Sequence, residues 1–309
     1  MQYPGSFVKE LQLVDNSSTP HYDWDNTDRE TMLQTLPALH LEPAVAEKWQ
    51  RLTERLQSLD SVIVAFSGGV DSSLLAVAAH YVLAPRMLAV TIRSQVETAG
   101  LMETAAALAL QFGFPHQFVD YDKLQDAAYT ANNAERCYVC KSTDLGMISE
   151  IAQKAGIRHV LLGANADDLG DYRPGLRAAA ELNVISPLAE VGLNKKEIRL
   201  LSRELGLGNW NHPSSPCLAS RIPYGIPVTR EKLEQIAQGE AYLHALNFQI
   251  VRVRNTGPTA RIEVAPREIE RLVGLRETIV AYFKQIGFEY VTLDLEGYRM
   301  GSLNKVLGQ

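Results

Sequence analysis

A glycine-rich segment is the first place in this chain where residue types and spacing could do chemistry. It lies between an apolar run at 62–66 and a helix-like stretch that starts at Leu74, and it consists of Ser67, Gly68, Gly69, Val70, Asp71, Ser72 and Ser73. Adjacent glycines let backbone N–H groups point at one anion, and a helix N-terminus adds partial positive charge. Small hydroxyls can donate to phosphate oxygens, whereas the carboxylate of Asp71 needs a Mg²⁺ between itself and a phosphate. The segment therefore predicts a site for phosphate and magnesium.

This segment is not a Walker A loop, because no Lys followed by Ser or Thr comes after its second glycine. Its pattern S-G-G-x-D-S-S resembles the PP-loop of the ATP pyrophosphatases. That resemblance implies ATP, cleaved between the α and β phosphates so that AMP is left on a substrate oxygen. A turn without a ligand is the alternative, but the strand-like and helix-like runs on either side favour a nucleotide site.

A second segment follows the apolar run 159–163 and reads Gly163-Ala164-Asn165-Ala166-Asp167-Asp168. A small residue at a strand exit permits close approach by a ligand, so we expect Gly163 to contact ATP. Paired carboxylates suit a Mg²⁺ that bridges pyrophosphate, and the predicted magnesium ligands are Asp71, Asp167 and Asp168. Asn and Asp also favour plain surface turns, which is the alternative. The sequence does not distinguish Asp167 from Asp168.

The three cysteines form the third group, and we expect all of them in loops: Cys137, Cys140 and Cys217. Zinc would need a fourth ligand such as His212, and a C-x-x-C pair could instead be a redox pair. Three thiolates fit a [4Fe–4S] cluster whose open iron holds a sulfide. A sacrificial or persulfide role for Cys217 alone stays open, as do inert cysteines. We expect the cluster, with all three cysteines catalytic.

Several cationic residues follow Cys217. Alternating residues of one strand share a face, and Arg252 and Arg254 alternate in this way. An arginine cluster in an acidic protein predicts a clamp for the phosphate of a substrate. A solvated strand face paired with acids such as Glu240 and Glu263 is the alternative. The predicted substrate-binding residues are Arg221, Arg252, Arg254, Arg261 and Glu240.

Composition narrows the class of protein. The chain has 309 residues, of which 46% are hydrophobic, as in globular proteins. We expect no membrane span, because no apolar run approaches the necessary length, and no secretion signal at the N-terminus. An odd, small number of cysteines favours a reducing, cytoplasmic setting. The net charge of −6 argues against a nucleic-acid partner.

Strand-like and helix-like runs alternate through the first two thirds of the chain. The expected strands are 62–66, 87–92, 117–121, 159–163 and, less clearly marked, 183–186; the expected helices are 44–59, 72–83, 96–112, 141–155 and 194–205. This order predicts an α/β fold with a doubly wound parallel sheet whose ligands lie at the carboxyl ends of the strands. We expect a polar extension at 1–41, a PP-loop domain at 42–210, and a cysteine loop with a smaller α+β domain at 211–309.

Taken together, several motifs resemble the LarE family of ATP-dependent sulfur transferases. Besides the PP-loop they are C-Y-x-C-K at 137–141, G-x-N-x-D-D at 163–168, D-Y-R-P-G at 171–175, S-P-L-A-E at 186–190, P-C-L-A-S-R-x-P-Y-G at 216–225 and L-D-L-x-G-Y-R-x-G-S at 293–302. The resemblance runs from about residue 42 to the C-terminus.

The LarE resemblance implies a small nucleotide substrate, pyridinium-3,5-biscarboxylic acid mononucleotide. Mg-ATP adenylates its carboxylate, and sulfur then displaces AMP to give the thiocarboxylate used in the nickel-pincer cofactor of lactate racemase. In some members the cysteine matching Cys217 gives up its own sulfur; in others three cysteines hold a [4Fe–4S] cluster with a transferable sulfide that a sulfur donor replenishes. Cys137 and Cys140 put this chain with the second group. The family also implies a homohexamer.

Three other functions remain in view. A tRNA thiolase would show a basic surface or an RNA-binding module, an amide-forming ligase would not need the cysteines, and a non-enzymatic carrier would release no pyrophosphate.

Overall fold

The structure is a computed structural model that describes residues 39–170, 174–213 and 215–299. The predicted extension therefore lies outside the described residues up to position 38. Parts of two motifs, at 171–173 and 300–302, also lie outside them. Among the helices that the structure describes, none is both long and apolar enough to cross a bilayer.

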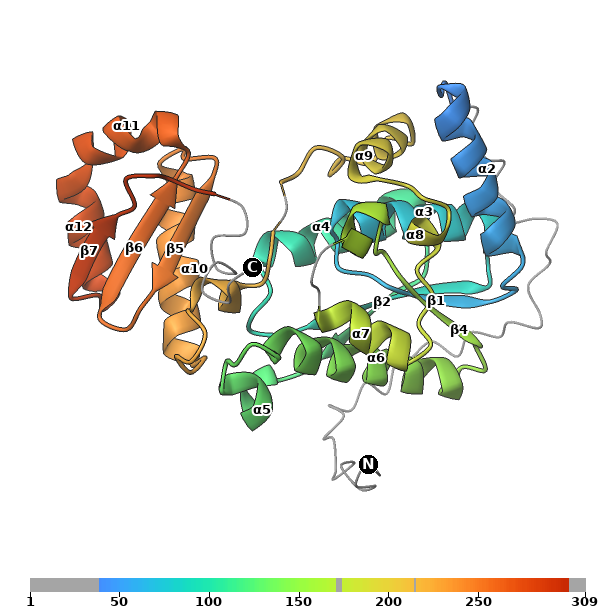
Figure 1. Ribbon diagram of the computed structural model, residues 1–309, viewed down its shortest axis with the longest axis horizontal. Coiled ribbons are helices and arrows are strands. Elements are labelled where there is room, and N and C mark those ends of the chain that lie inside the picture. The colour runs from blue at the N-terminus through green and yellow to red at the C-terminus, as the bar shows by residue number, and fades with distance from the viewer. Residues whose placement is uncertain (1–38, 171–173, 214, 300–309) are drawn as a thin grey trace.

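A four-stranded parallel sheet organises the larger part of the chain (Figure 1). Its strands are β1 (Val62–Ala65), β2 (Met87–Arg93), β3 (His116–Asp120) and β4 (His159–Leu162), in the order β3-β2-β1-β4. The prediction of a doubly wound parallel sheet is thus confirmed. The order reverses direction at β1, so the ligand crevice expected for such sheets lies outside the carboxyl ends of β1 and β4.

Helices cover both faces of this sheet. One face carries α2 (Pro43–Gln57), α3 (Val70–Leu83), α4 (Ala99–Phe112), α8 (Pro187–Glu190) and α9 (Lys195–Glu204). The other face carries α6 (Arg136–Lys154) and α7 (Pro174–Glu181) (Figure 1). Each strand sends alternate side chains into the two cores: Val62 and Val64 pack toward α3, and Ile63 toward α6.

Two expected elements differ from the structure. The segment 183–186 is not a strand, since it makes only a single bridge between Ile185 and Leu161. The helix expected to begin at residue 141 begins at Arg136, so Cys137 and Cys140 lie in the first turns of α6 and not in a loop. Residues 136–140 include no glycine or proline, and nothing in them stops the helix from starting earlier.

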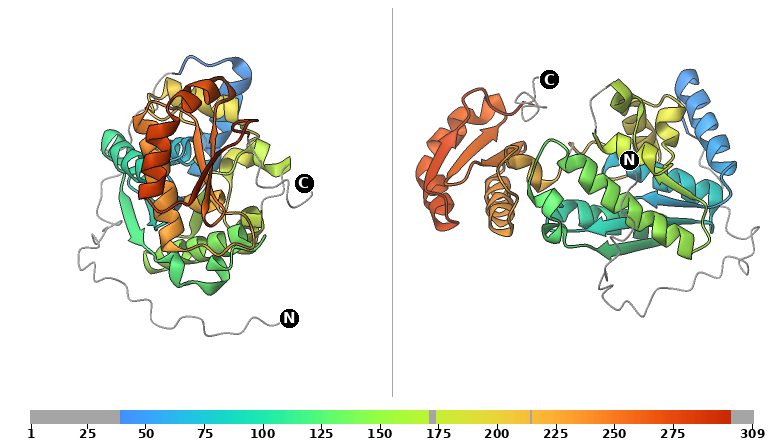
Figure 2. Two further views of the ribbon diagram at one scale, coloured as in Figure 1. Left: turned by 90° about the vertical axis from the view of Figure 1, so that its left-hand side faces the viewer. Right: turned by 60° about the horizontal axis from the view of Figure 1, so that its bottom comes forward.

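The C-terminal elements build a smaller α+β unit at one end of the molecule (Figures 1 and 2). They are α10 (Arg230–Ala245), β5 (Val251–Asn255), β6 (Thr259–Val264), η4 (Pro266–Glu268), α11 (Ile269–Gly274), α12 (Arg276–Gln285) and β7 (Tyr290–Leu293). Strand β6 lies between antiparallel β5 and parallel β7. This second sheet has its own core, which includes Phe248, Val253 and Phe283. The predicted boundary at 210/211 stays a prediction.

Three short segments lie at the carboxyl edge of the large sheet. They are η1 (Lys123–Gln125) with α5 (Ala127–Thr130), η2 (Ala166–Gly170), and η3 (Leu218–Arg221). Leu218 donates its N–H to the carbonyl of Val96 at 2.7 Å, and η3 also packs against α10 and β5. The Cys217 segment therefore joins the two units.

Candidate active site at the carboxyl edge of the sheet

The glycine-rich segment makes the turn from β1 into α3, as the sequence predicts. Gly68 has φ +75°, and a Cβ there would lie 2.5 Å from the carbonyl oxygen of Leu101. Only glycine fits this position, because both the backbone conformation and the close approach of α4 exclude a side chain. Gly69 is the N-cap of α3, so the free N–H groups of the first helical turn open at this edge.

The serine hydroxyls of this segment have different surroundings. Ser67 is exposed, and its N–H donates to Ser72 Oγ at 3.2 Å. Ser72 Oγ in turn donates to the carbonyl of Gly69 at 3.1 Å. Ser73 is fully buried and lies away from the surface of the loop. Ser67 and Ser72 are thus better placed than Ser73 to reach a phosphate.

Asn209 is a residue that the sequence did not point to. Its buried side chain donates both to the carbonyl of Gly68 and to Ser73 Oγ, each at 2.9 Å. Asn209 therefore fixes the glycine-rich segment from a position 136 residues further along the chain than Ser73. Because it sits in a turn-like stretch, Asn209 offered no sequence signal beyond its preference for turns.

Lys195 is a second residue to which the sequence did not point. Its ammonium lies 2.6 Å from Asp71 Oδ2, at the start of α9. A lysine in the first turn of a helix is unfavourable because its charge opposes the helix dipole. This unfavourable position is the one sign in the sequence that Lys195 has another role. Burial raises the pKa of Asp71 above its ordinary value; Lys195 opposes this rise, and repulsion from Asp168 adds to it.

The turn after β4 lies directly against the start of α3. A Cβ on Gly163 would be 2.8 Å from the backbone nitrogen of Ser72, which explains the need for glycine there. Asp168 is buried and accepts the N–H of Asn165 at 3.0 Å. Asp167 is exposed and accepts the N–H of Lys195 at 2.9 Å.

These carboxylates fit a magnesium ion. Asp71 Oδ1 is buried and has no hydrogen-bond partner among the described residues, although a buried carboxylate oxygen normally has one. Asp168 is close enough to Asp71 to raise its pKa. Two such carboxylates at a helix N-terminus are ligands of the kind that Mg²⁺ uses together with phosphates. Of the two aspartates that the sequence left open, the geometry favours Asp168.

The fold brings the three cysteines to the same region although Cys217 is distant in sequence. Cys140 from α6 and Cys217 from the N-cap of η3 pack against one apolar cluster that includes Tyr129 and Leu218. Cys137 is close enough to Cys217 to affect its pKa. All three are free and partly exposed. Cys140 contacts Lys123, which follows β3, and the residue after Cys217 bonds to Val96, which follows β2, so these two cysteines lie toward the carboxyl edge of the sheet.

A buried lysine accompanies Cys140. Lys123, 2% exposed, donates to Cys140 Sγ at 3.2 Å and to Asp144 Oδ2 at 2.9 Å. Glu97 lies 3.5 Å from the same ammonium. Burial raises the pKa of the Cys140 thiol to about 12, and Asp144 adds to the rise while Lys123 opposes it.

A buried arginine accompanies the other two cysteines. Arg136, also 2% exposed, donates to Asn132 Oδ1 and, at 2.9 Å, to the carbonyl of Ala219. Burial raises the pKa of Cys217, and the charge of Arg136 opposes that rise. Arg136 thereby ties the first turn of α6 to η3.

The cysteines suit a [4Fe–4S] cluster in the number and type of their donors, and the two buried cations would offset the negative charge of such a group. As positioned, however, no three Cys, His, Asp or Glu side chains of the described residues form a ready metal site. Cluster binding therefore stays a prediction.

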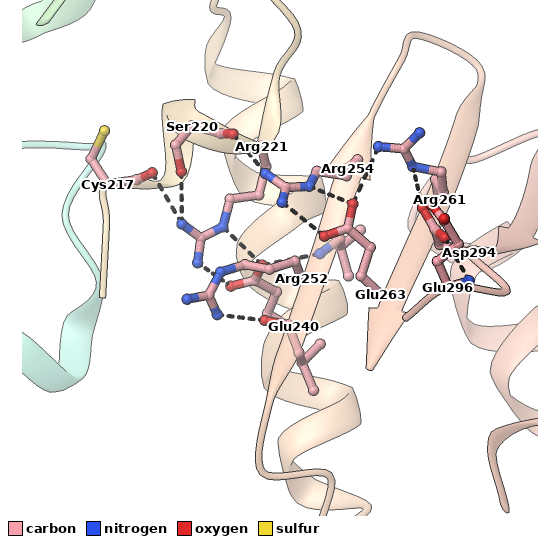
Figure 3. Close-up of polar contacts among 12 residues, drawn as sticks. Cys217, Ser220, Arg221, Glu240, Arg252, Arg254, Arg261, Glu263, Asp294 and Glu296 are labelled. Atoms are coloured by element: carbon pink, nitrogen blue, oxygen red, sulfur yellow. Dashed lines mark hydrogen bonds and ion pairs between the residues drawn. The ribbon is translucent and has the colours of Figure 1, made fainter. Parts of the chain in front are cut away.

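The predicted substrate-binding arginines form a network of ion pairs at the junction of the two units (Figure 3). Arg221, 1% exposed, makes two 2.9 Å bonds to Glu240 and also donates to the carbonyls of Pro216 and Cys217. In Figure 3 the Cys217 sulfur points away from this network. Arg221 thus holds the cysteine segment in place, and its contact with substrate stays a prediction.

The other arginines lie on β5 and β6. Buried Arg254 pairs with Glu263 through two bonds of 2.9 and 2.7 Å and donates to the carbonyl of Ser220 at 3.0 Å. Arg261, 47% exposed at its side chain, shares Glu263. Arg252 lies over the ring of Tyr298, and burial lowers its pKa. The structure brings the five predicted residues together, with Arg252 and Arg261 the most accessible.

Comparison with known proteins gives two kinds of match. The family model of NAD synthase matches residues 45–169. The chain is 43% identical to uncharacterized protein slr1717 of Synechocystis sp., over 84% of this chain and 98% of that protein. It is 36% identical to pyridinium-3,5-bisthiocarboxylic acid mononucleotide synthase of Lactiplantibacillus plantarum, over 85% of this chain and 96% of that protein. A more distant match is a glutamine-hydrolyzing GMP synthase component of Pyrococcus furiosus, 27% identical over 65% of this chain and 67% of that protein.

Proposed function

Because the chain belongs to the LarE family, we propose that it is an ATP-dependent sulfurtransferase that acts on pyridinium-3,5-biscarboxylic acid mononucleotide. It adenylates a carboxylate of this substrate and then exchanges AMP for sulfur. The observation that supports the proposal is that two groups of residues lie at the carboxyl edge of one sheet: the glycine-rich turn with Asp71, and the three cysteines, near which Arg136 bonds to η3.

In the activation step, the N–H groups at the start of α3 and the hydroxyls of Ser67 and Ser72 bind the phosphates of ATP. Asp71 and Asp168 would hold Mg²⁺, which neutralises charge on the departing pyrophosphate. Lys195, which pairs with Asp71 in the structure, would be free to donate to the phosphates if Asp71 held the metal. Adenylation removes the negative charge that makes a carboxylate a poor electrophile and supplies AMP as a leaving group.

In the second step, sulfur attacks the acyl adenylate and AMP leaves. A [4Fe–4S] cluster held by Cys137, Cys140 and Cys217 would supply the transferable sulfide. The protein's own residues position this sulfur: Arg136 and Arg221 both bind backbone carbonyls of the 216–219 segment. Holding sulfur beside the activated carbonyl replaces a high free concentration of sulfide.

For the substrate, the arginine network is our proposed clamp. Arg252 and Arg261 bind the phosphate and carboxylate groups. The buried Arg221 and Arg254, with Glu240, hold the surrounding network in place. We also propose that the enzyme works in the cytoplasm, as a homohexamer supplied by a sulfur donor, in keeping with its family.

Pyrophosphate release tests the activation step. Purified protein is incubated with Mg-ATP and the dicarboxylate nucleotide, and pyrophosphate is measured with and without the nucleotide. Release that depends on the nucleotide is expected. Release of equal size with no acceptor, or with an RNA acceptor only, would refute the proposal.

The source of sulfur has a second candidate, because the described residues hold no ready metal site. In that case Cys217 donates its own sulfur. Iron and sulfide analysis of anaerobically prepared protein, followed by mass spectrometry after one turnover, separates the two routes. Bound iron with an intact Cys217 supports the cluster; iron-free active protein that loses one sulfur at Cys217 supports sacrifice.

A further inference from the structure

The hydroxyl of Tyr129 is buried among the cysteines without a partner. Tyr129 is 2% exposed, and its hydroxyl oxygen makes no hydrogen bond to any described residue. A buried hydroxyl normally has a partner, because its burial without one costs free energy. The turn that carries Tyr129 is fixed, because Asp126 accepts the backbone N–H of Tyr129 at 3.2 Å at the start of α5.

The groups around this hydroxyl are either thiols or buried cations. Cys217, Cys140, Arg136 and Lys123 all act on it electrostatically. The two cysteines pack against the same apolar cluster as the tyrosine ring. The Tyr129 side chain therefore packs near both thiols. Arg136 is linked to the same turn, because it donates to Asn132, whose N–H donates to the Tyr129 carbonyl.

Arg136 is the second unusual feature of this region. No carboxylate of the described residues lies within ion-pair distance of its guanidinium, which contacts the Asn132 amide, the Ala219 carbonyl and the ring of Tyr224 instead. A buried cation without an anion is costly unless its environment supplies a counter-charge. Lys123 differs, since Asp144 balances it.

Within the part of the chain that the structure describes, the Tyr129 hydroxyl is a donor without an acceptor, and the Arg136 guanidinium is a cation without an anion. Together, near two thiols, they suit a small anion that accepts a hydrogen bond. We propose that Tyr129 and Arg136 form a binding site for hydrosulfide, in which the phenol donates a hydrogen bond to the sulfur and the guanidinium balances its charge. A sulfur held there lies beside Cys140 and Cys217. The inference rests on the proposed function only for the use made of this sulfur.

The test uses full-length, metal-free protein under anaerobic conditions, titrated with sodium hydrosulfide in a calorimeter. Wild-type protein is expected to bind one hydrosulfide per chain. Tyr129→Phe removes only the hydroxyl and is expected to weaken binding by about tenfold or more, as for a hydrogen bond to a charged group. Tyr81→Phe, in α3 on the opposite side of the sheet, is the matched control and is expected to bind as wild type.

Two further measurements separate a binding role from a structural one. Tyr129→Phe is expected to unfold at the same temperature as wild type or higher, since it loses a buried hydroxyl without a partner. Arg136→Lys, which keeps the charge, is expected to bind hydrosulfide more tightly than Arg136→Gln.

Wild-type protein that takes up no hydrosulfide, Tyr129→Phe that binds it normally, or Tyr129→Phe that unfolds at a clearly lower temperature would each overturn the inference. Pyrophosphate release, measured on the same samples, keeps this result apart from the proposed function. If the protein binds hydrosulfide but does not adenylate the nucleotide, the proposed function is refuted and the hydrosulfide site is not.

Discussion

Glu240 accepts both Nε–H and Nη2–H of Arg221 at 2.9 Å, and the two side chains are almost completely buried. The same glutamate accepts the backbone N–H of Val253 at 3.0 Å. This ion pair joins η3, which carries the Cys217 segment, to α10 and β5 of the smaller unit.

Glu240→Gln should therefore destabilise the protein strongly. It leaves the charge of Arg221 buried without its partner, which costs about 3–5 kcal/mol. Thermal or urea unfolding measures this loss. Glu277→Gln, at the exposed pair with Arg276, is the control and should change the free energy of unfolding by about 1 kcal/mol or less. Equal effects of the two changes would show that the buried pair does not hold the junction.

Asn209→Ala should weaken ATP binding. Without the amide, the carbonyl of Gly68 and the hydroxyl of Ser73 lose their shared donor, and the glycine-rich turn loosens. A rise of about tenfold in the KM for ATP is expected, which corresponds to one or two hydrogen bonds. Asn211→Ala, an exposed residue nearby, should leave KM unchanged. A normal KM in Asn209→Ala would contradict the positioning role.

Asp71→Asn should separate activity from stability. Because burial raises the pKa of Asp71 in the folded state, this carboxyl contributes stability fully only below its ordinary pKa, and the contribution is lost as pH rises through the raised value. At neutral pH the variant should thus unfold no more readily than wild type. Pyrophosphate release should fall by about a hundredfold or more, as expected for loss of a metal ligand. Retained release would exclude the magnesium role.

Two glycine substitutions should act in opposite directions. Gly163→Ala places a Cβ 2.8 Å from the backbone of Ser72 and should cost about 1–3 kcal/mol while lowering pyrophosphate release. Gly146→Ala, within α6, meets no atom within 4 Å and should stabilise by about 0.5–1 kcal/mol. Chemical denaturation of both variants checks the signs, and a destabilised Gly146→Ala would show that the space around α6 is filled.

Acid should destabilise the protein partly through His116. Burial lowers the pKa of His116 to about 4, so the folded state favours the neutral ring, which contacts Thr91 at 2.8 Å. Stability is therefore lost as pH falls from the ordinary histidine value of about 6.5 toward 4. His116→Gln should show a smaller loss over this interval in unfolding scans at several pH values. A His116→Gln scan that matches wild type would assign the acid loss elsewhere.

Sequence patterns predicted the parts of this site that are local. The turn from β1 into α3 and the turn after β4 each carry their own signal, since glycine, serine and aspartate at a strand exit act within a few residues. The order of strands and helices followed in the same way from periodicity, because each element is apolar on the side it buries.

The missing parts depend on tertiary contacts. Asn209 and Lys195 reach the glycine-rich turn from more than a hundred residues away, and only the packing of α9 against α3 brings them there. Likewise, the pairing of Arg221 with Glu240 depends on the packing of η3 against α10, which the alternation of charges in the sequence does not reveal.

Segment η3 is bonded to both units of the molecule. On one side it is fastened to the loop after β2 through Leu218, and on the other to the smaller unit through Arg221 and through Ser220, which accepts from Arg254. A rotation of the smaller unit would therefore also move the Cys217 thiol. Binding of the nucleotide by the smaller unit and approach of the Cys217 sulfur would then be coupled, so that the sulfur reaches the active site only when a nucleotide is bound.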